Sequence, residues 1–387
     1  MRICMVVPYD LAEEGGVKRH AVQLAATLRR LGDDVDVIGP VSGHRALGEH
    51  VYGFRGVVNI VSNSSDNRLG IFACPHKVRR LFRDKSYDVV HIHEPLQPSL
   101  NYYAVWCASP RAARIATFHA FSEQESTALL RARKFWSAIA FPAYDRGIAV
   151  SPAAAEYARV TFKKPMTIIP NGIRTELYRP GLAPSSGPLK LLFVGHWRDS
   201  RKGLPYLLEA CGKLRERGVE WTLDIVGDGG QVPPSELPGV TYHGPISSET
   251  RIAELYAACD VFVSPATGME SFGIVLLEAM ASSRAIVCSD IAGYRYAVGS
   301  GPTCGAKLVT PGSVDGIVAA LAELATDPAA RVKMGAQNRE RAREFDWDNL
   351  VARVRDEYCA ALEARGVRAE PLPRPAVASP STTGAAV

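Results

Sequence analysis

The sequence predicts an α/β fold of two successive domains, each with a parallel sheet and crossover helices. A chain of 387 residues is too long for one ordinary core and fits two domains of typical size. Short apolar runs rich in β-forming residues alternate with helical patterns throughout, as in parallel strands joined by helices. A Pro/Gly/Ser cluster at Arg179–Pro188 lies between two such series and predicts the linker.

Seven apolar runs in the first half predict strands. They are Arg2–Pro8, Asp34–Pro40, Val57–Val61, Tyr87–His93, Arg114–His119, Gly147–Ser151 and Met166–Pro170. Between the first two, apolar residues recur at helical spacing from Val17 to Leu28 and predict a helix over about 16–31, with Gly32 as its stop. We therefore expect residues 1–172 to form the first domain.

Five further runs predict the strands of a second domain at residues 189–345. They are Leu189–Gly195, Trp221–Gly227, Val240–Gly244, Val261–Pro265 and Ala285–Ser289. A last helix is expected at about residues 347–365. Residues 367–387 are rich in Pro, Ala, Ser and Thr and offer little to bury, which predicts a disordered tail.

The composition is that of a globular protein, with 47% apolar and 22% charged residues. The segment Met1–Pro8 resembles a signal peptide only superficially, because it lacks a long apolar core and a small-residue cleavage site. No apolar run approaches the length needed to cross a bilayer. We expect a cytoplasmic protein, or one bound peripherally to the inner face of the plasma membrane.

The eight cysteines are scattered along the chain and form no C-x-x-C pair. Several lie in apolar strand or helix patterns, where cysteine behaves as a small hydrophobic residue. This distribution argues against a disulfide framework or a zinc site and favours reduced thiols.

The net charge of +5 is unevenly placed. Residues 1–180 hold 24 Lys and Arg against 16 Asp and Glu, a balance of +8, whereas the remainder holds 21 against 24, a balance of −3. A basic first half suggests an anionic partner there, such as a membrane surface or a phosphorylated acceptor. We expect no nucleic-acid partner.

The strongest functional pattern is a pair of glutamates, Glu270 and Glu278, separated by seven residues at a predicted strand-to-helix junction. The intervening Phe272-Gly273-Ile274 would present free N–H groups at a helix N-terminus, which suits a diphosphate. Glu278 could then accept hydrogen bonds from ribose hydroxyls, and Glu270 would face the donor sugar. The alternative is a capped helix with two surface acids, but the block as a whole favours the functional interpretation.

This block resembles the E-x7-E signature of the retaining GT-B glycosyltransferases, family four of the sequence classification. The similarity extends from Met1 to about residue 365. It implies two facing Rossmann-like domains with the donor/acceptor cleft between them, the nucleotide-sugar donor on the C-terminal domain and the acceptor on the N-terminal one. It also implies that the final helix packs back on the first domain, and that no metal or other cofactor is required.

Further motifs match the family's donor site. Gly15-Gly16 resembles the glycine pair beside the donor diphosphate, although a plain βα turn is the alternative. The run Arg201-Lys202-Gly203 resembles the segment whose lysine binds donor phosphate. His196 stands where the family commonly has Arg, so Arg198 or Arg201 would have to substitute. The backbone of Ile246 matches the position that meets the nucleobase.

Two histidine motifs end predicted strands. His119 matches the family's active-site histidine, which contacts the transferred sugar. The run His91-Ile92-His93-Glu94-Pro95 resembles the family's H-x-H-E-P run. Alternation places His91 and His93 on the same side of a strand, as metal ligands could be, but no third ligand is evident. We interpret this pair as structural or cleft-lining.

The acceptor side is predicted from a polar loop. Asn63, Ser65 and Arg68 resemble the segment that receives an inositol phosphate, and Tyr9 matches as well. The sequence departs from the family pattern where Ser62 replaces an aromatic residue and Lys18 replaces an amide.

A short amphipathic helix is predicted at Pro75–Lys85, with an apolar face that includes Val78 and Phe82. Away from that face it carries the basic residues Lys77, Arg79, Arg80 and Arg83, while Lys85 lies on the apolar side. Such a helix suits anionic lipid headgroups, and the alternative is a solvated basic face above an apolar core contact. Related mannosyltransferases use a helix of this kind at the membrane, which favours the first interpretation.

These matches predict a glycosyltransferase. Within the family, the chain is most similar to members that transfer mannose from GDP-mannose to a phosphatidylinositol lipid. In this hypothesis Lys202 stabilises the departing diphosphate, Glu270 orients the sugar hydroxyls, and His119 positions the sugar from the opposite domain. The alternatives are a soluble sugar-phosphate or natural-product acceptor, a nucleotide-sugar epimerase, and a non-enzymatic nucleotide-binding scaffold.

Overall fold

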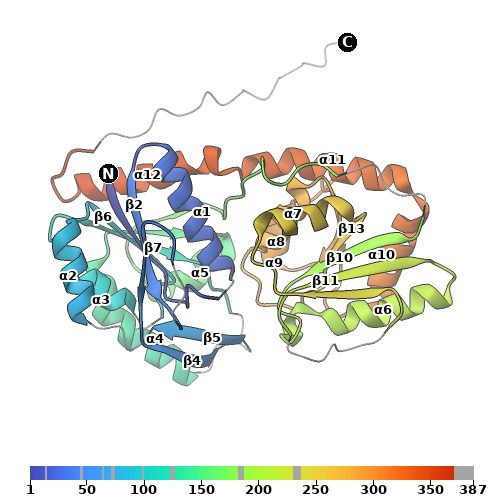
Figure 1. Cartoon of the computed structure of the whole chain (residues 1–387), viewed down its shortest axis with the longest axis horizontal. Helices are drawn as coiled ribbons and strands as arrows, with labels where there is room; N and C mark the ends of the chain where they lie inside the picture. The colour runs from blue at the N-terminus through green and yellow to red at the C-terminus, as the bar shows by residue number, and fades with distance from the viewer. Residues whose placement is uncertain are drawn as a thin grey trace, which may run out of the picture.

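The structure is a computed structural model that describes residues 1–13, 15–43, 47–62, 65–70, 75–97, 100–122, 127–181, 187–229 and 237–369. Two α/β domains lie side by side, and the last two helices run along one edge of both (Figure 1). Residues 182–186 of the predicted linker and 370–387 of the predicted tail lie outside the described ranges.

The first sheet has seven parallel strands in the order β3-β2-β1-β6-β7-β8-β9. Their bounds are β1 (Arg2–Val6), β2 (Asp34–Pro40), β3 (Val51–Phe54), β6 (Val89–His93), β7 (Ala113–Phe118), β8 (Arg146–Ala149) and β9 (Met166–Ile168). All but β3 coincide with predicted runs. The sequence missed β3 because it is a short edge strand interrupted by a glycine.

One predicted strand belongs elsewhere. The run Val57–Val61 forms β4 (Val57–Ser62), which pairs antiparallel with β5 (Ser65–Gly70) in a separate two-stranded hairpin. The expectation of a polar loop for Ser65 and Arg68 was therefore wrong, because both residues lie on a strand. A local pattern of alternating residues does not say which partner strand it will find.

Helices cover the faces of the first sheet. They are α1 (Gly16–Arg30), α2 (Pro75–Lys85), α3 (Leu100–Cys107), α4 (Thr127–Ala140) and α5 (Pro152–Arg159), with a 3₁₀ turn at Phe141–Ala143. The start of α5 illustrates local control, because the Ser151 hydroxyl accepts the Ala154 N–H at 3.1 Å and proline occupies the first turn.

The second sheet has six parallel strands in the order β12-β11-β10-β13-β14-β15. The strands are β10 (Leu189–Val194), β11 (Trp221–Val226), β12 (Val240–Gly244), β13 (Val261–Ser264), β14 (Ala285–Ser289) and β15 (Ala306–Val309), of which only β15 was not predicted. The helices are α6 (Leu204–Glu216), α7 (Glu249–Ala258), α8 (Ile274–Ala281), α9 (Ala292–Val298) and α10 (Val314–Thr326).

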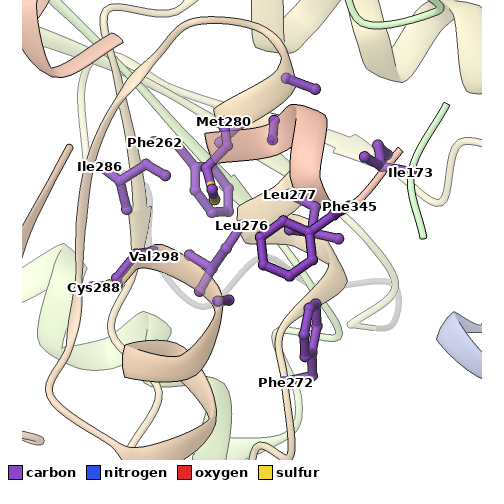
Figure 2. Packing of buried hydrophobic residues seen from close by; sticks show 14 of the residues in the cluster. Ile173, Phe262, Phe272, Leu276, Leu277, Met280, Ile286, Cys288, Val298 and Phe345 are labelled. Carbon is purple, nitrogen blue, oxygen red and sulfur yellow. The ribbon is translucent and has the colours of Figure 1, made fainter. Parts of the chain in front are cut away.

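An apolar cluster fixes α8 in the second domain (Figure 2). Leu276, Leu277 and Met280 of α8 are fully buried, and Phe262 and Ile286 of the neighbouring strands belong to the same cluster. The rigid packing of a buried helix holds its N-terminus in one place, which a binding site at that N-terminus requires.

The chain crosses between the domains twice, and the two crossings pair with each other. Helix α11 (Pro328–Glu344) covers the second domain and α12 (Trp347–Glu363) packs on α1 and β7 of the first. Between these helices, the Ile173 N–H donates to Phe345 O at 2.9 Å and the Trp347 N–H donates to Ile173 O at 3.1 Å. Gly172 has no room for a side chain, since a Cβ there would lie 2.3 Å from the Trp347 ring.

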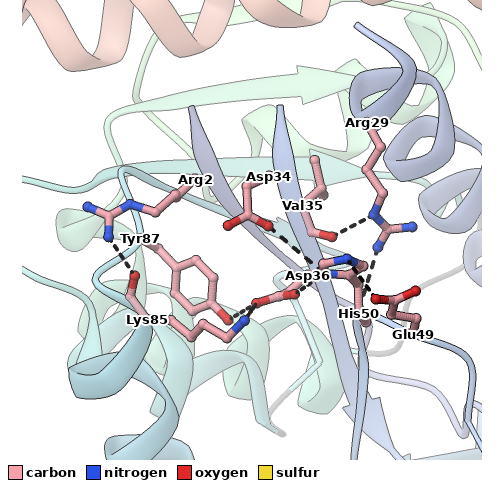
Figure 3. Close-up of polar contacts among 9 residues, drawn as sticks. All are labelled: Arg2, Arg29, Asp34, Val35, Asp36, Glu49, His50, Lys85 and Tyr87. Atoms are coloured by element: carbon pink, nitrogen blue, oxygen red, sulfur yellow. Dashed lines mark hydrogen bonds and ion pairs between the residues drawn. The ribbon is translucent and has the colours of Figure 1, made fainter. Parts of the chain in front are cut away.

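A buried carboxylate connects α2 to the first sheet (Figure 3). Asp36 of β2 accepts the Tyr87 hydroxyl at 2.7 Å and pairs with Lys85 Nζ at 3.3 Å and His50 Nδ1 at 3.1 Å. Asp34, Asp36 and His50 are close enough to hold a cation together. Lys85 and the Tyr87 hydroxyl already satisfy Asp36, which explains how its charge is buried.

Each sheet reverses its strand order once, between β1 and β6 in the first and between β10 and β13 in the second. In open α/β sheets, ligands bind beyond the carboxyl ends of the strands at such a reversal. The described cysteines are free thiols. Among the described helices, none is both long and apolar enough to span a bilayer.

Candidate active site

The segments that follow the carboxyl ends of the two sheets meet between the domains. Arg19 of α1 forms an ion pair with Glu278 of α8, and Gln23 Nε2 donates to Glu249 Oε1 at 2.8 Å. A Cβ built on Gly16 would lie 3.5 Å from the side chain of Ile274. The first turns of α1 and α8 therefore approach each other closely across the boundary.

Both helices begin without a side-chain cap. The N-cap residues are Gly15 for α1 and Gly273 for α8, and neither helix has an acidic residue in its first turn. The first N–H groups of a helix need acceptors, and the helix dipole places partial positive charge there. Two such ends near each other form a site suited to an anion with several oxygens, such as a diphosphate.

The loop before α8 has a backbone that glycine makes possible. Gly273 has φ +90°, and Met269 has φ +57°, an uncommon conformation for a residue with a side chain. The packing is close around Gly293, where a Cβ would lie 2.1 Å from Glu270 O. Strained backbone held by tight packing is typical of sites where a loop must present particular groups.

Lys202 and Glu270 lie together beside this loop. Lys202 Nζ donates to Glu270 Oε1 at 2.5 Å, and the side chains are 27% and 15% exposed. Lys202 ends a 3₁₀ turn, and Gly203 follows it with φ +75° and packs directly on Pro265 O. This contact holds the lysine against the loop from which Glu270 projects.

The arginines near His196 are not equivalent. Arg201 is held bidentately by Asp199, with Nη2 2.5 Å from Oδ2 and Nε 3.0 Å from Oδ1. His196 and Arg198 are both exposed. Because Asp199 already neutralises Arg201, Arg198 is the better candidate to supply the charge that an arginine at position 196 would provide.

Glu278 is completely buried and carries two partners. The Tyr256 hydroxyl donates to its Oε2 at 2.9 Å, and Arg19 pairs with Oε1. The negative charge of Glu278 raises the pKa of the Arg19 guanidinium above its usual range. The sequence analysis did not identify Arg19. A basic residue in the first turn of a helix, where the dipole disfavours it, was the only available signal.

The two remaining donor-site candidates, Phe272 and Ile246, could contact a ligand mainly through their backbone atoms. The Phe272 side chain is 1% exposed and packs with its ring centroid 5.7 Å from that of Phe345, so the residue can reach a ligand only through its main chain. Ile246 is partly buried against the core of the second domain. Both placements agree with a role for the backbone and give no role to the side chains.

Three imidazoles gather on the first-domain side. His93 Nδ1 and His119 Nε2 are 3.2 Å apart, and the His20 ring centroid is 4.8 Å from that of His119. The three residues come from α1, β6 and the segment after β7, and one ring nitrogen of each lies within 4.8 Å of the others. His20 is thus the third nearby ligand that the sequence did not reveal, and these three histidines form a second group that could hold a metal ion.

Burial keeps these imidazoles neutral. It lowers the pKa of His20 to about 3 and lowers the pKa of His93 and His119 well below the usual value for histidine. In a neutral imidazole one ring nitrogen donates a hydrogen bond and the other accepts one. In the His93–His119 contact, therefore, the nitrogen of one ring donates to the nitrogen of the other. His119 can therefore hydrogen-bond a sugar hydroxyl without adding positive charge.

His91 has a structural role. Its Nδ1 is 2.7 Å from the Tyr358 hydroxyl and its Nε2 is 2.6 Å from Thr117 Oγ1. Its ring stacks on that of His93 with a centroid distance of 4.4 Å. Both ring nitrogens are occupied, so His91 connects α12 to the sheet and supports His93 from behind.

Glu94 is a further titratable group at this site. It is 2% exposed with φ +54°, and burial raises the pKa of its carboxyl to about 7, partly opposed by the backbone N–H groups of His119 and Ala120. Glu94 also acts on Tyr9, whose pKa is raised by burial and by the Glu94 charge. The sequence showed Glu94 only as part of the histidine motif and gave no sign of its burial.

The acceptor candidates are only partly placed. Tyr9 is half-buried beside β1, and Lys18 Nζ lies 3.4 Å from Leu11 O in the same region. Ser65 and Arg68 lie on β5, of which the structure describes the backbone. Asn63 lies outside the described residues. The structure brings Tyr9 and Lys18 to the carboxyl end of the first sheet.

Two facing doubly wound domains with this arrangement define the GT-B fold. Among solved structures, the chain superposes on sucrose-phosphate synthase from Thermosynechococcus elongatus with a TM-score of 0.72 and 20% identity, covering 94% of this chain and 99% of that one. It superposes equally on Anabaena HepE in complex with UDP and glucose, with a TM-score of 0.72, 20% identity and coverage of 92% and 99%.

The sequence comparisons are more specific. Residues 14–177 match the family described as "Glycosyltransferase Family 4", and residues 188–327 match "Glycosyl transferases group 1". Phosphatidyl-myo-inositol mannosyltransferase of Mycolicibacterium smegmatis is 32% identical over 92% of this chain and 93% of its own length. Glycogen synthase of Mycobacterium tuberculosis is 29% identical over 97% of each chain. The chain therefore belongs to glycosyltransferase family 4 and is a retaining glycosyltransferase.

Proposed function

We propose that this enzyme transfers mannose from GDP-mannose to a phosphatidylinositol lipid, with retention at the anomeric carbon. The observation that carries the site assignment is the meeting of the uncapped first turns of α1 and α8 beside the Lys202–Glu270 pair. Relatives named phosphatidyl-myo-inositol mannosyltransferase, at 30–32% identity over 92% of this chain, support the choice of donor and acceptor.

In this proposal the donor diphosphate lies between the two helix ends. The anomeric carbon loses its bond to the phosphate oxygen and gains one to the acceptor hydroxyl on the same face. The hydroxyl proton passes to the leaving phosphate oxygen. Lys202 and the first N–H groups of α8 meet the charge that develops on the leaving group, which is the most effective place for preorganised donors.

The remaining groups orient the donor. Glu270 accepts hydrogen bonds from the sugar hydroxyls, and the neutral His119 contacts the sugar from the first domain. Glu278 binds the ribose hydroxyls, which requires exchange of its ion pair with Arg19. Tyr9 and Lys18 lie on the acceptor side, together with the hairpin that carries Ser65 and Arg68.

Thermal unfolding with a nucleotide panel tests the donor assignment. The protein is unfolded alone and with GDP, UDP, ADP, dTDP and their sugar conjugates. A ligand at 100 times its Kd stabilises the native state by about 2.7 kcal/mol, so we expect a clear rise in Tm with GDP and GDP-mannose.

The other outcomes of this panel are informative in different ways. Selective stabilisation by UDP or dTDP species would keep the transferase and overturn the choice of mannose donor. An absence of response to every nucleotide would contradict the site between the domains.

A further inference from the structure

The basic helix α2 cannot insert into a membrane with its apolar face. Val78 and Phe82 on that face are 0% and 6% exposed and belong to the core of the first domain. Lys85 is committed to the buried Asp36. The part of α2 that a bilayer could contact is its exposed basic side chains, Lys77, Arg79, Arg80 and Arg83, which we call the basic row.

An exposed apolar surface, which insertion into a bilayer requires, lies on the neighbouring helices α3 and α4. Trp106 of α3 and Phe135, Trp136 and Ile139 of α4 are 58%, 62%, 44% and 48% exposed. We call these four residues the aromatic patch. Half of the strongly exposed large hydrophobic residues in the described part of the chain belong to it.

The patch is continuous. The ring of Tyr102, also on α3, has its centroid 6.0 Å from that of Trp106 and 6.3 Å from that of Trp136 on α4. The ring centroids of Phe135 and Trp136 are 5.4 Å apart. Helices α2, α3 and α4 follow one side of the first domain (Figure 1), and α2 packs on α3. Burial raises the pKa of Cys107, the neighbour of Trp106, and the charge of nearby Arg79 partly opposes that rise. The basic row of α2 therefore lies beside the patch, as the packing of α2 on α3 also requires.

The charges around the patch indicate its partner. Helix α2 carries five basic side chains and α4 carries three, against the single acidic Asp84. Arg133 turns inward to Tyr157, but Arg131 and Lys134 are exposed beside the aromatic rings. Tryptophan favours the membrane–water interface, and basic residues are attracted to anionic headgroups.

We infer that the aromatic patch inserts into the interface of an anionic bilayer while the basic row of α2 contacts the headgroups. Charge alone or one small apolar group gives marginal, reversible binding, whereas two signals together give stable anchoring. The inference rests on the proposed function in one respect, because a lipid acceptor requires the enzyme to work at a membrane.

The test is vesicle binding of the full chain without donor. Vesicles of neutral lipid, with or without phosphatidylinositol, are mixed with wild type, a W106S/F135S/W136S variant and a V332S control, which removes an exposed apolar residue from α11. We expect the triple variant to bind anionic vesicles at least about tenfold more weakly at physiological salt. The control should bind as wild type does.

Brominated lipids provide a second readout. Of the five tryptophans, Trp221 and Trp347 are 3% and 1% exposed, so quenching on vesicle binding should come mainly from Trp106 and Trp136 and disappear in W106F/W136F. Unchanged vesicle binding by the triple variant, undiminished quenching in W106F/W136F, or dimerisation of the wild type that the triple variant abolishes would overturn the inference.

The result is separable from the proposed function. Thermal stabilisation by nucleotide, measured on the same variants, shows whether fold and donor site are intact. Wild-type vesicle binding that depends on the patch, without sugar transfer to lipid, would reject the acceptor assignment and leave the membrane surface standing.

Discussion

Replacing Lys202 with alanine should reduce kcat by about 10³-fold while leaving the fold intact. Lys202 Nζ lies 2.5 Å from Glu270 at the loop before α8, so its charge is next to the proposed position of the leaving diphosphate. The charge on that diphosphate grows as the glycosidic bond breaks, and the lysine therefore stabilises the transition state more than the bound donor. Steady-state kinetics with saturating donor measure the effect.

The control for this experiment is K190A, which removes an exposed lysine from β10 of the same domain. Its kinetics should match those of wild type. K202A should keep a cooperative unfolding transition, because the Lys202–Glu270 pair is partly exposed and contributes little to stability. Near-normal turnover of K202A would remove the lysine from the mechanism.

Replacing Gly273 with alanine should raise the donor KM by about tenfold or more and cost about 2 kcal/mol of stability. Gly273 has φ +90°, and a Cβ there would lie 2.7 Å from Tyr294 Cε1. Tyr294 is 1% exposed and its hydroxyl is 2.8 Å from Ser264 Oγ, so the ring cannot easily move away. The loop must shift instead, and with it the N–H groups that meet the diphosphate.

The matched control is G212A in the middle of α6, where a Cβ would meet nothing within 4 Å. Alanine is a better helix former than glycine, so this variant should be as stable as wild type or slightly more stable. Donor titrations and chemical denaturation distinguish the two effects at Gly273. A G273A variant that binds donor normally would show that the loop backbone does not hold the diphosphate.

Most of the sheet architecture could be predicted because the information is local. Buried parallel strands are continuous apolar runs, and eleven of the twelve predicted runs mark strands of the two parallel sheets. The helix Pro75–Lys85 was predicted with its observed bounds. The run Val57–Val61 forms the predicted strand, but in an antiparallel hairpin and not in the parallel sheet, because pairing direction depends on the partner strand and not on the run itself.

Parts of the site that depend on long-range contacts could not be predicted. Arg19 and Glu278 are 259 positions apart, and nothing in the sequence around either residue indicates that they form an ion pair. His20 joins His93 and His119 only because α1 and the ends of β6 and β7 converge. In the same way, the helical pattern could show that α2 is amphipathic but not whether its apolar face is covered.

The aromatic patch could not be predicted from the sequence for the same reason. Trp106 and Trp136 occur in apolar helical patterns, where the default interpretation of a tryptophan is a core residue. Their exposure depends on which face of α3 and α4 packs on the sheet, and that choice is made by the whole domain. The sequence suggested that α2 alone contacts the membrane. With the structure, the proposed membrane-binding surface extends over α2, α3 and α4.

Acceptor-dependent transfer is the most direct test of the proposed function. The purified enzyme is incubated with GDP-mannose, with and without vesicles that contain phosphatidylinositol, and both released GDP and mannosylated lipid are measured. We expect GDP release only when the lipid is present, in equal amount to the product, with the configuration of the donor sugar retained. Release of GDP without acceptor, conversion of the donor sugar alone, or an inverted product would contradict the account.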